Sequence, residues 1–168
     1  MAQPVHSQAM SPLAACRPPL EQPMAKPRPH AFPQVSPNPS AVAPLDRPSR
    51  LAAHYRDLAL RQTEVLILLA FDRNGAVLTE HRFEGDPHGV QVSAAEVLRG
   101  ALWVRASAVA LVHNHPSGWA TPSAADLAFT RRIEDSCFLL QLALVDHVII
   151  ASRGWLSLRD SGVLRRPA

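Results

Sequence analysis

Hydrophobic residues occur in short runs from residue 51 onward, and the spacing within each run predicts an element of secondary structure. Continuous apolar runs, as at 65–71, are typical of strands that are buried on both faces. Apolar positions three and four apart, behind a Ser-x-x-Glu or Ser-x-x-Asp start, favour amphipathic helices. We expect strands at 65–71, 76–83, 108–113, 142–151 and 155–158, and helices at 49–62, 93–105 and 123–138.

Turn residues between these elements indicate how they connect. The segment 72–75 ends in the Asn-Gly pair that closes tight hairpins, and Ser-Arg-Gly at 152–154 separates the last two strands. The pattern predicts an α/β fold of the α+β kind, with a mixed, largely antiparallel sheet of about five strands flanked by helices. The side chains expected to face the core from the three helices are Leu51, Tyr55 and Leu58, then Val97, Leu98, Ala101 and Leu102, and then Leu127, Ile133 and Phe138.

Proline separates a tail from this folded part. Twelve of the sixteen prolines fall in residues 1–50, where the apolar residues show no regular period. Repeated prolines interrupt both helices and strand pairing, so we expect residues 1–48 to form a disordered, partly extended Pro-rich tail. The folded domain is then expected at 49–168, a length that buries one core without disulfide bonds.

The net charge of +3 resides in the tail. Residues 1–50 carry five basic and two acidic side chains, whereas residues 51–168 carry twelve arginines and twelve acidic residues. A domain that grips nucleic acid through its phosphates needs a basic face, and this balance gives no sign of one. Direct nucleic-acid binding is therefore not expected, and the basic tail is interpreted as a solvated segment.

The two cysteines, Cys16 and Cys137, do not amount to a disulfide framework. No run of the sequence approaches the roughly 18 apolar residues of a membrane span, and the N-terminus lacks the apolar core of a secretory signal. We therefore expect a cytoplasmic protein without a membrane partner. The sequence carries no signal for an oligomeric state.

The segment 113–126 concentrates side chains that bind metal ions. His113 and His115 are expected to point to one face, because alternate residues of a strand do so, and Asp126 opens the helix that follows a Pro-Ser-Gly turn. Two neutral imidazoles and one carboxylate, with a fourth position left to water, are typical of a catalytic zinc site. Taken alone, Ser123 and Asp126 are explained as a helix cap, but a cap does not explain the two imidazoles.

The spacing His-x-His, seven residues, Ser, two residues, Asp resembles the motif of the JAB/MPN (JAMM) metalloprotease superfamily. The string His-Asn-His-Pro-Ser-Gly resembles the bacterial RadC branch, as do segments at 68–74, 93–98, 146–150 and 157–164. The resemblance covers about residues 50–165 and implies an MPN or cytidine-deaminase-like fold. Longer RadC proteins begin with a helix-hairpin-helix segment, which the Pro-rich first fifty residues do not resemble, so the chain resembles a short form.

The resemblance also implies roles for individual side chains. It implies a general base at the start of the first core strand, where Glu64 stands. It implies a serine hydroxyl that stabilises an oxyanion, and the matching residue is Ser123. The implied zinc ligands are His113, His115 and Asp126.

Other side chains compete for some of these roles. Glu80, Glu84 and Glu96 are alternatives to Glu64 as the base, although the first two fit exposed strand positions and Glu96 fits a capping box. Asp146 and His147 are expected either to orient a zinc-binding histidine or to form a satisfied pair in the core. Trp119 is a candidate cover for part of a substrate groove.

The function expected from this resemblance is zinc-dependent hydrolysis of peptide or isopeptide bonds in a protein or peptide substrate, by a zinc-activated water with a glutamate as general base. The alternatives are a DNA-repair-associated RadC-like protein and a non-catalytic MPN interaction module. The letters His-Asn-His do not indicate an HNH nuclease, in which these residues are dispersed over a hairpin and a helix.

Overall fold

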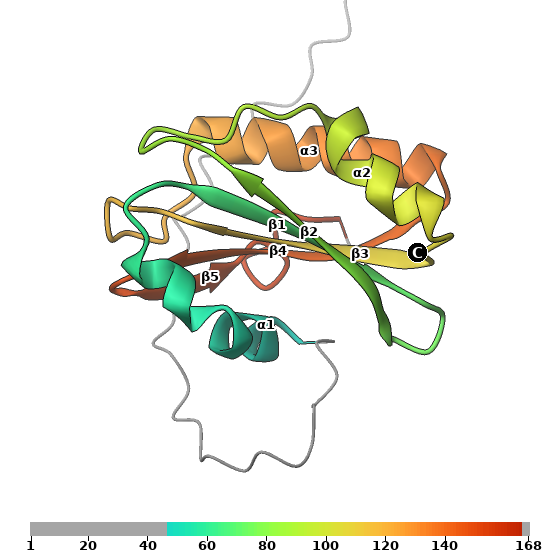
Figure 1. Ribbon diagram of the computed structural model, residues 1–168, viewed down its shortest axis with the longest axis horizontal. Coiled ribbons are helices and arrows are strands. Elements are labelled where there is room, and N and C mark those ends of the chain that lie inside the picture. The colour runs from blue at the N-terminus through green and yellow to red at the C-terminus, as the bar shows by residue number, and fades with distance from the viewer. Residues whose placement is uncertain (1–46, 166–168) are drawn as a thin grey trace, which may run out of the picture.

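The computed structural model describes residues 47–165, which form a five-stranded sheet and the helices packed on it (Figure 1). The sheet order is β2-β1-β3-β4-β5. The strands are β1 (Val65–Phe71), β2 (Val77–Glu84), β3 (Ala108–Asn114), β4 (Ala143–Ala151) and β5 (Gly154–Ser157). The helices are α1 (Pro48–His54), the 3-10 helix η1 (Arg56–Leu60), α2 (Ala94–Trp103) and α3 (Ala124–Leu139).

The sheet is mixed, as the sequence pattern predicts. Strand β1 pairs antiparallel with both β2 and β3, and β4 pairs antiparallel with β5. Only β3 and β4 run parallel, with α3 as the crossover between them. This topology confirms the predicted α/β fold with a largely antiparallel sheet, and it places the end of β3 beside the start of α3.

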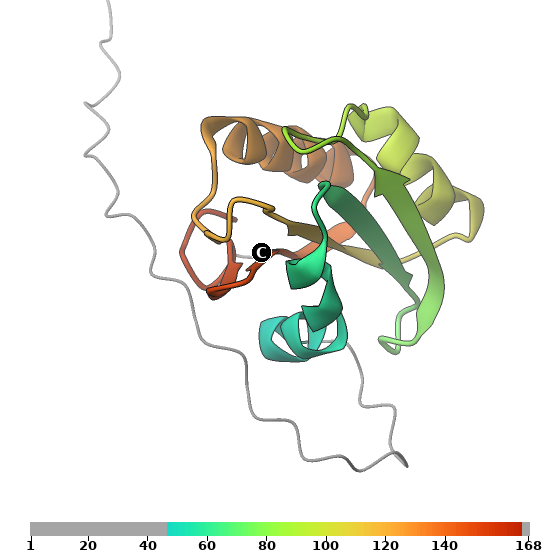
Figure 2. The ribbon, with the colours of Figure 1, turned by 60° about the vertical axis from the view of Figure 1, so that its left-hand side comes forward.

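Helices cover both faces of the sheet, with α2 and α3 on one face and α1 and η1 on the other (Figures 1 and 2). Strand β1 is buried over its whole length, which confirms the two-sided burial expected from its unbroken apolar run. Its alternate residues serve the two layers: Leu66 and Leu68 pack toward α2 and α3, and Val65 and Ile67 pack toward α1.

Three details of the predicted helices are wrong. The expected helix at 49–62 divides at Tyr55, where α1 ends and η1 begins. Leu102 is 45% exposed because it lies beyond the buried stripe of α2, which is formed by Val97, Leu98 and Ala101. Phe138 is 78% exposed because the buried stripe of α3 passes through Thr130, Ile133 and Cys137 instead.

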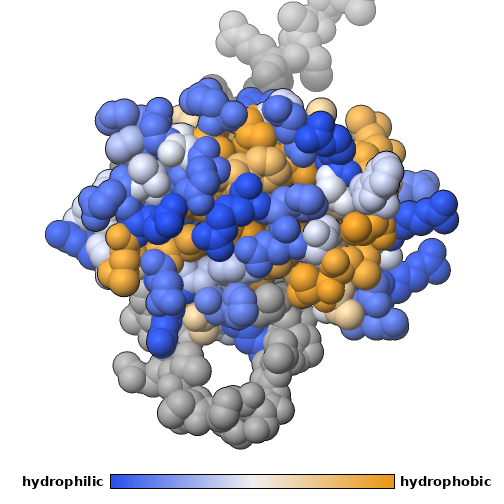
Figure 3. All heavy atoms as spheres, viewed as in Figure 1, coloured by the Kyte–Doolittle hydropathy of each residue, from blue (hydrophilic) through white to orange (hydrophobic). Residues whose placement is uncertain are grey.

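The surface is mostly hydrophilic on the face shown in Figure 3, with apolar side chains gathered in separate patches. Among residues 47–165, no helix combines the length and the apolar character that crossing a bilayer requires. Cys137 is a free, buried thiol. Residues 1–46, which hold Cys16 and most of the predicted Pro-rich tail, lie outside the described residues.

Candidate metal centre

Strand β3 brings two imidazoles to one side of the sheet. His113 is buried near the end of the strand, and its backbone is opposite Leu66 of β1. His115 follows directly after the strand, and its backbone N–H still donates to the carbonyl of Ile150 at 2.9 Å. Because this pairing continues the extended backbone, His115 keeps the orientation of His113, as alternate strand residues do.

The first turn of α3 supplies a carboxylate that is fixed by a capping box. The Asp126 backbone N–H donates to Oγ of Ser123 at 3.1 Å. In return, the backbone N–H and the hydroxyl of Ser123 each donate to Oδ2 of Asp126 at 2.7 Å. A capping box stabilises the start of a helix, and here it also fixes the orientation of the Asp126 side chain.

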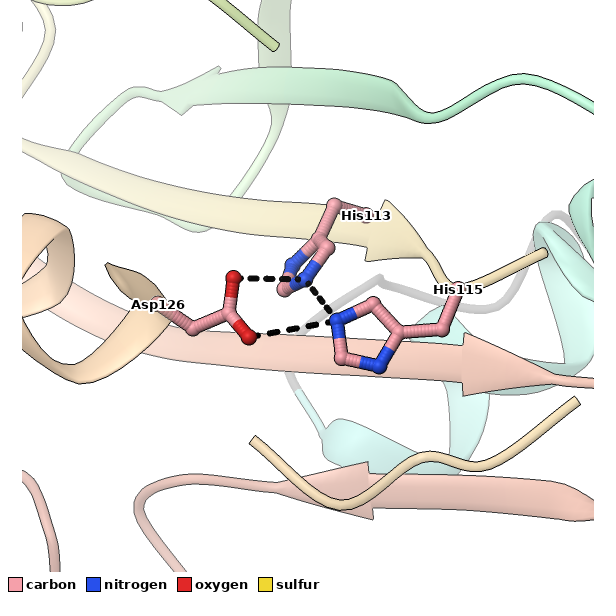
Figure 4. A group of neighbouring side chains, drawn as sticks. All are labelled: His113, His115 and Asp126. Carbon is pink, nitrogen blue, oxygen red and sulfur yellow. Dashed lines mark hydrogen bonds and ion pairs between the residues drawn. The ribbon is translucent and has the colours of Figure 1, made fainter. Parts of the chain in front are cut away.

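The three side chains converge on one point from these two elements (Figure 4). Nε2 of His113 lies 3.2 Å from Oδ1 of Asp126, and Nε2 of His115 lies 3.2 Å from Oδ2. The two Nε2 atoms are 2.9 Å apart. The side chains of His113, His115 and Asp126 are 5%, 10% and 15% exposed, so the group is largely removed from bulk water.

This arrangement suits a small divalent ion. Ligand atoms at about 2.0–2.2 Å from a tetrahedral zinc lie about 3.4 Å from one another, close to the separations observed here. Nδ1 of His115 is 2.8 Å from the carbonyl oxygen of Trp119, which can only accept, so this nitrogen carries the ring proton of a neutral imidazole. Nε2 of His115 then presents its lone pair toward His113 and Asp126. The donor set and its spacing therefore fit a metal ion.

The charges within the group favour metal ligation by Asp126. Burial raises the pKa of Asp126, but the imidazoles of His113 and His115, which donate to the carboxylate whenever Nε2 carries a proton, outweigh that effect and hold the pKa well below its usual range. Burial lowers the pKa of His115, but the hydrogen bond to Asp126 and the charge of its carboxylate raise it above its ordinary value overall. The carboxylate is thus ionised at neutral pH, whereas protons compete for His115.

Glu64 lies in the same cavity, directly before β1. The cavity has a volume of about 490 Å³, and its lining includes Glu64 and the three candidate ligands. The backbone of Glu64 is held on both sides, since its N–H donates to the carbonyl of Asp86 at 2.9 Å and its carbonyl accepts from Gly85 at 2.8 Å. Burial raises the pKa of the Glu64 carboxyl, which is the direction that a general base near neutral pH requires.

The three competing glutamates have other partners. Glu80 and Glu84 are exposed on β2, as expected, where they contact Tyr55 and Arg61. Glu96 closes the predicted capping box of α2 with Ser93. None of the three lines the cavity that contains the ligands. Glu64 is therefore the glutamate that the fold brings to the metal centre.

Ser123 lines the cavity too, but its hydroxyl is engaged in the capping box. A serine hydroxyl has a single proton, and in this arrangement that proton is directed to Oδ2 of Asp126. The oxyanion role implied by the family resemblance requires the hydroxyl to rotate toward a substrate, and it stays a prediction.

Of the neighbouring residues Asp146 and His147, only His147 contacts a candidate ligand. Its Nε2 lies 2.8 Å from Nδ1 of His113, and its Nδ1 lies 2.6 Å from Oγ1 of Thr130. Asp146 instead accepts from the hydroxyl of Ser157 at 2.6 Å and is a satisfied core carboxyl. The contacts therefore favour the orienting role for His147, which stays a prediction, and the core role for Asp146.

The sequence analysis assigns no role to two polar residues near the centre. Asn114, between the two ligating histidines, and Thr130, on α3, are buried. Each is a polar residue at an otherwise apolar position of its element, and this signal alone could have singled them out. Trp119 does not line the cavity; its ring stacks with the guanidinium of Arg153, 4.0 Å from the ring centre.

A mixed sheet with two histidines at the end of a central strand and an acid in the first turn of the following helix defines a domain of the JAB type. The family model described as a RadC-like JAB domain matches residues 45–163, so the chain belongs to this family. UPF0758 proteins of two strains of Acidithiobacillus ferrooxidans are each 44% identical to the chain over 123 residues. The match covers 70% of this chain and 54% of each relative, so the chain spans about half the length of the curated relatives it matches.

Proposed function

We propose that this protein is a zinc-dependent hydrolase that cleaves peptide or isopeptide bonds. The observation that carries the proposal is the convergence of two imidazole nitrogens, 2.9 Å apart, on the carboxylate of Asp126, whose two oxygens each lie 3.2 Å from one of these nitrogens. The three side chains line a cavity that also contains Glu64. Membership of the RadC-like JAB family supports it, because the JAB/MPN superfamily includes metalloproteases with this spacing of ligands.

The side chains of His113, His115 and Asp126 would hold the ion through two nitrogens and one oxygen. Zinc held by three such ligands acts as a Lewis acid on a carbonyl group and lowers the pKa of water to about 7. A non-catalytic interaction module has no need of this complete set, and no observation favours that alternative.

Proton transfer falls to Glu64 in this proposal. Its carboxylate accepts a proton from the attacking water and delivers that proton to the nitrogen of the leaving amine. The raised pKa of Glu64, caused by its burial, brings the acid and base forms closer to balance at neutral pH. The Ser123 hydroxyl would break its hydrogen bond to Oδ2 of Asp126 and donate a hydrogen bond to the developing oxyanion instead.

The walls of the cavity suit a length of peptide. Besides the candidate ligands, the lining includes residues 88–92, between β2 and α2, and Phe129 and Arg132 of α3. The net neutrality of residues 51–168 gives no support for a nucleic acid in this place.

The test is cleavage of a mixed peptide library by the zinc-loaded full chain, with products identified by mass spectrometry. Glu64→Gln keeps the size of the side chain and removes the base, so we expect it to cleave at least about 100-fold more slowly. Glu84→Gln is the matched control outside the cavity and is expected to cleave at the wild-type rate. Equal rates for wild type and Glu64→Gln, or the lack of any cleaved peptide, would contradict the proposal.

A further inference from the structure

A line of hydrogen bonds runs behind the metal centre, from one ligand to the backbone of another. Nδ1 of His113 lies 2.8 Å from Nε2 of His147, and Nδ1 of His147 lies 2.6 Å from Oγ1 of Thr130. Oγ1 of Thr130 lies 2.6 Å from the backbone carbonyl oxygen of Asp126. We call this set the histidine–threonine relay. Its two middle members, His147 and Thr130, are 1% and 0% exposed, so water does not replace either contact.

The carbonyl end fixes the direction of every hydrogen bond in the relay. A carbonyl oxygen only accepts, so the Thr130 hydroxyl donates its single proton to Asp126. Oγ1 must then accept from Nδ1–H of His147. A neutral imidazole carries one N–H, so Nε2 of His147 accepts in turn from Nδ1–H of His113. Nε2 of His113 is left with its lone pair, and this atom faces His115 and Asp126.

The surroundings of His147 support this direction. His147 is only 1% exposed, so water does not reach its ring and both ring nitrogens must find their partners within the protein. Its sequence neighbour Asp146 does not engage the ring: that carboxylate accepts from the hydroxyl of Ser157 and from the backbone N–H groups of His147 and Arg159. Thr130 is therefore the sole partner that the described residues offer to Nδ1 of His147.

We propose that His147 and Thr130 are positioning residues that hold His113 in the tautomer whose Nε2 lone pair faces the metal ion. The relay also ties the two ligand-bearing elements together, because it joins His113 of β3 to the first turn of α3 through β4. This inference rests on the metal site of the proposed function and not on the cleavage of a substrate. Groups that hydrogen-bond to metal-binding histidines in this way contribute to metal affinity in proteins generally.

Nuclear magnetic resonance of the ring nitrogens tests the direction of the relay. In the zinc-loaded, 15N-labelled full chain, long-range proton–nitrogen correlations show which ring nitrogen of each histidine carries hydrogen. We expect His147 to carry its single proton on Nδ1. A His147 protonated on Nε2, or on both nitrogens, would overturn the proposal, because neither form can accept from His113.

Zinc affinity tests the consequence, measured by competition with a chromogenic chelator and without any substrate. Thr130→Val keeps the shape of the side chain and removes the hydroxyl, and we expect it to weaken zinc binding about 10- to 100-fold. Thr130→Ser restores the hydroxyl and should bind within about threefold of wild type. Ile133→Val is the matched control: Ile133 is buried on the same helix, lies outside the relay, and its variant should keep wild-type affinity.

The outcomes separate this inference from the proposed activity. Wild-type affinity in Thr130→Val, or equally weak binding in Thr130→Val and Thr130→Ser, would overturn the relay. If Thr130→Val does not fold, the ring-nitrogen spectrum of the wild type decides. A protein that shows the expected affinities but cleaves no peptide would confirm the relay and contradict the hydrolase, whereas a protein that binds no zinc would overturn both.

Discussion

The side-chain amide of Asn114 hydrogen-bonds to the backbone of Val65 and so helps to position Glu64, the residue before Val65. Oδ1 of Asn114 accepts from the backbone N–H of Val65 at 2.8 Å, and Nδ2 donates to the backbone carbonyl of Thr63 at 3.0 Å. Asn114 stands between the two ligating histidines and its side chain turns to the other face of β3. One buried residue therefore couples the position of the expected base to the position of the metal ligands.

Replacing Asn114 with alanine should separate catalysis from metal binding. The change leaves the N–H of Val65 without its partner, and an unsatisfied buried group of this kind costs about 1–3 kcal/mol of unfolding free energy. Because Glu64 then loses the contacts that hold both of its neighbours in the chain, Thr63 and Val65, and keeps only its own backbone pairing with the residues just after β2, we expect kcat for peptide cleavage to fall at least about tenfold. Zinc affinity should stay close to wild type. Urea unfolding, chelator competition and cleavage kinetics measure the three effects, and unchanged kcat would contradict the coupling.

Two capping boxes within residues 47–165 offer a matched pair of substitutions. Ser93→Ala and Ser123→Ala remove the same hydroxyl from the start of α2 and of α3, and each should cost about 1 kcal/mol of stability. Only Ser123 also holds the carboxylate of a metal ligand. We expect Ser123→Ala to weaken zinc binding severalfold and Ser93→Ala to leave it unchanged. Equal zinc affinities in the two variants would show that the capping box does not orient Asp126.

Zinc affinity should depend on pH through His115. Its pKa is raised because the hydrogen bond to Asp126 and the carboxylate charge outweigh the lowering effect of burial. A raised pKa means that the proton stays bound at a pH where an ordinary imidazole, with a pKa of about 6.5, has lost it. Zinc must displace that proton, so affinity should fall about tenfold for each pH unit below the pKa of His115. Asp126 adds little to this dependence because its pKa is held well below its usual range.

The measurement is a zinc titration from about pH 8 down to about pH 5 in a buffer that does not bind the metal. Affinity should decrease as the pH falls and the decrease should begin above the pKa of free imidazole. A constant affinity over this range would contradict the assignment of His115 as a ligand.

Gly118 lies in the loop that holds His115, and Gly75, which also has a positive φ but lies far along the chain, is its matched control. Gly118 has a φ of +84°, and a Cβ there would lie 2.9 Å from Oγ of Ser152. Gly75, in the β1–β2 hairpin, has a φ of +81° with open space around it. Alanine costs about 1–2 kcal/mol at either position, because L-residues with side chains avoid this backbone conformation.

Only the change at Gly118 should reach the metal centre. The carbonyl of the next residue, Trp119, accepts the ring N–H of His115, so a shift of this loop releases the imidazole. We expect Gly118→Ala to weaken zinc binding severalfold and Gly75→Ala to leave it unchanged, as measured by chelator competition. Unfolding of both variants in denaturant checks that their stabilities are similar. Weakened binding in both variants would point to a general loss of stability instead.

The features that the sequence predicts well are those that depend on neighbours along the chain. The capping box at Ser123, the hairpin at Asn74-Gly75 and the paired imidazoles of His113 and His115 each need only a few adjacent residues. The family motif adds the approach of Asp126, which depends on the crossover from β3 to α3. All of these are confirmed in the structure.

The features that the sequence does not predict depend on residues far apart in the chain. Asn114 contacts Val65 across 49 residues, and the choice between the two interpretations of His147 depends on its contact with His113 across 34 residues. Neither distance leaves a periodic signal, so only the arrangement of the strands shows these pairs. The exposure of Phe138 is of the same kind, since it depends on which side of α3 meets the sheet. The cytoplasmic location, the tail at 1–48 and the protein or peptide substrate stay predictions.

The proposed function requires above all that His113, His115 and Asp126 share one metal ion. Anomalous X-ray scattering from crystals of the zinc-loaded full chain, recorded at the zinc absorption edge, locates the ion directly. We expect one peak at about 2.0–2.2 Å from Nε2 of both histidines and from an oxygen of Asp126. A fully loaded crystal with no zinc peak between these three side chains would contradict the account.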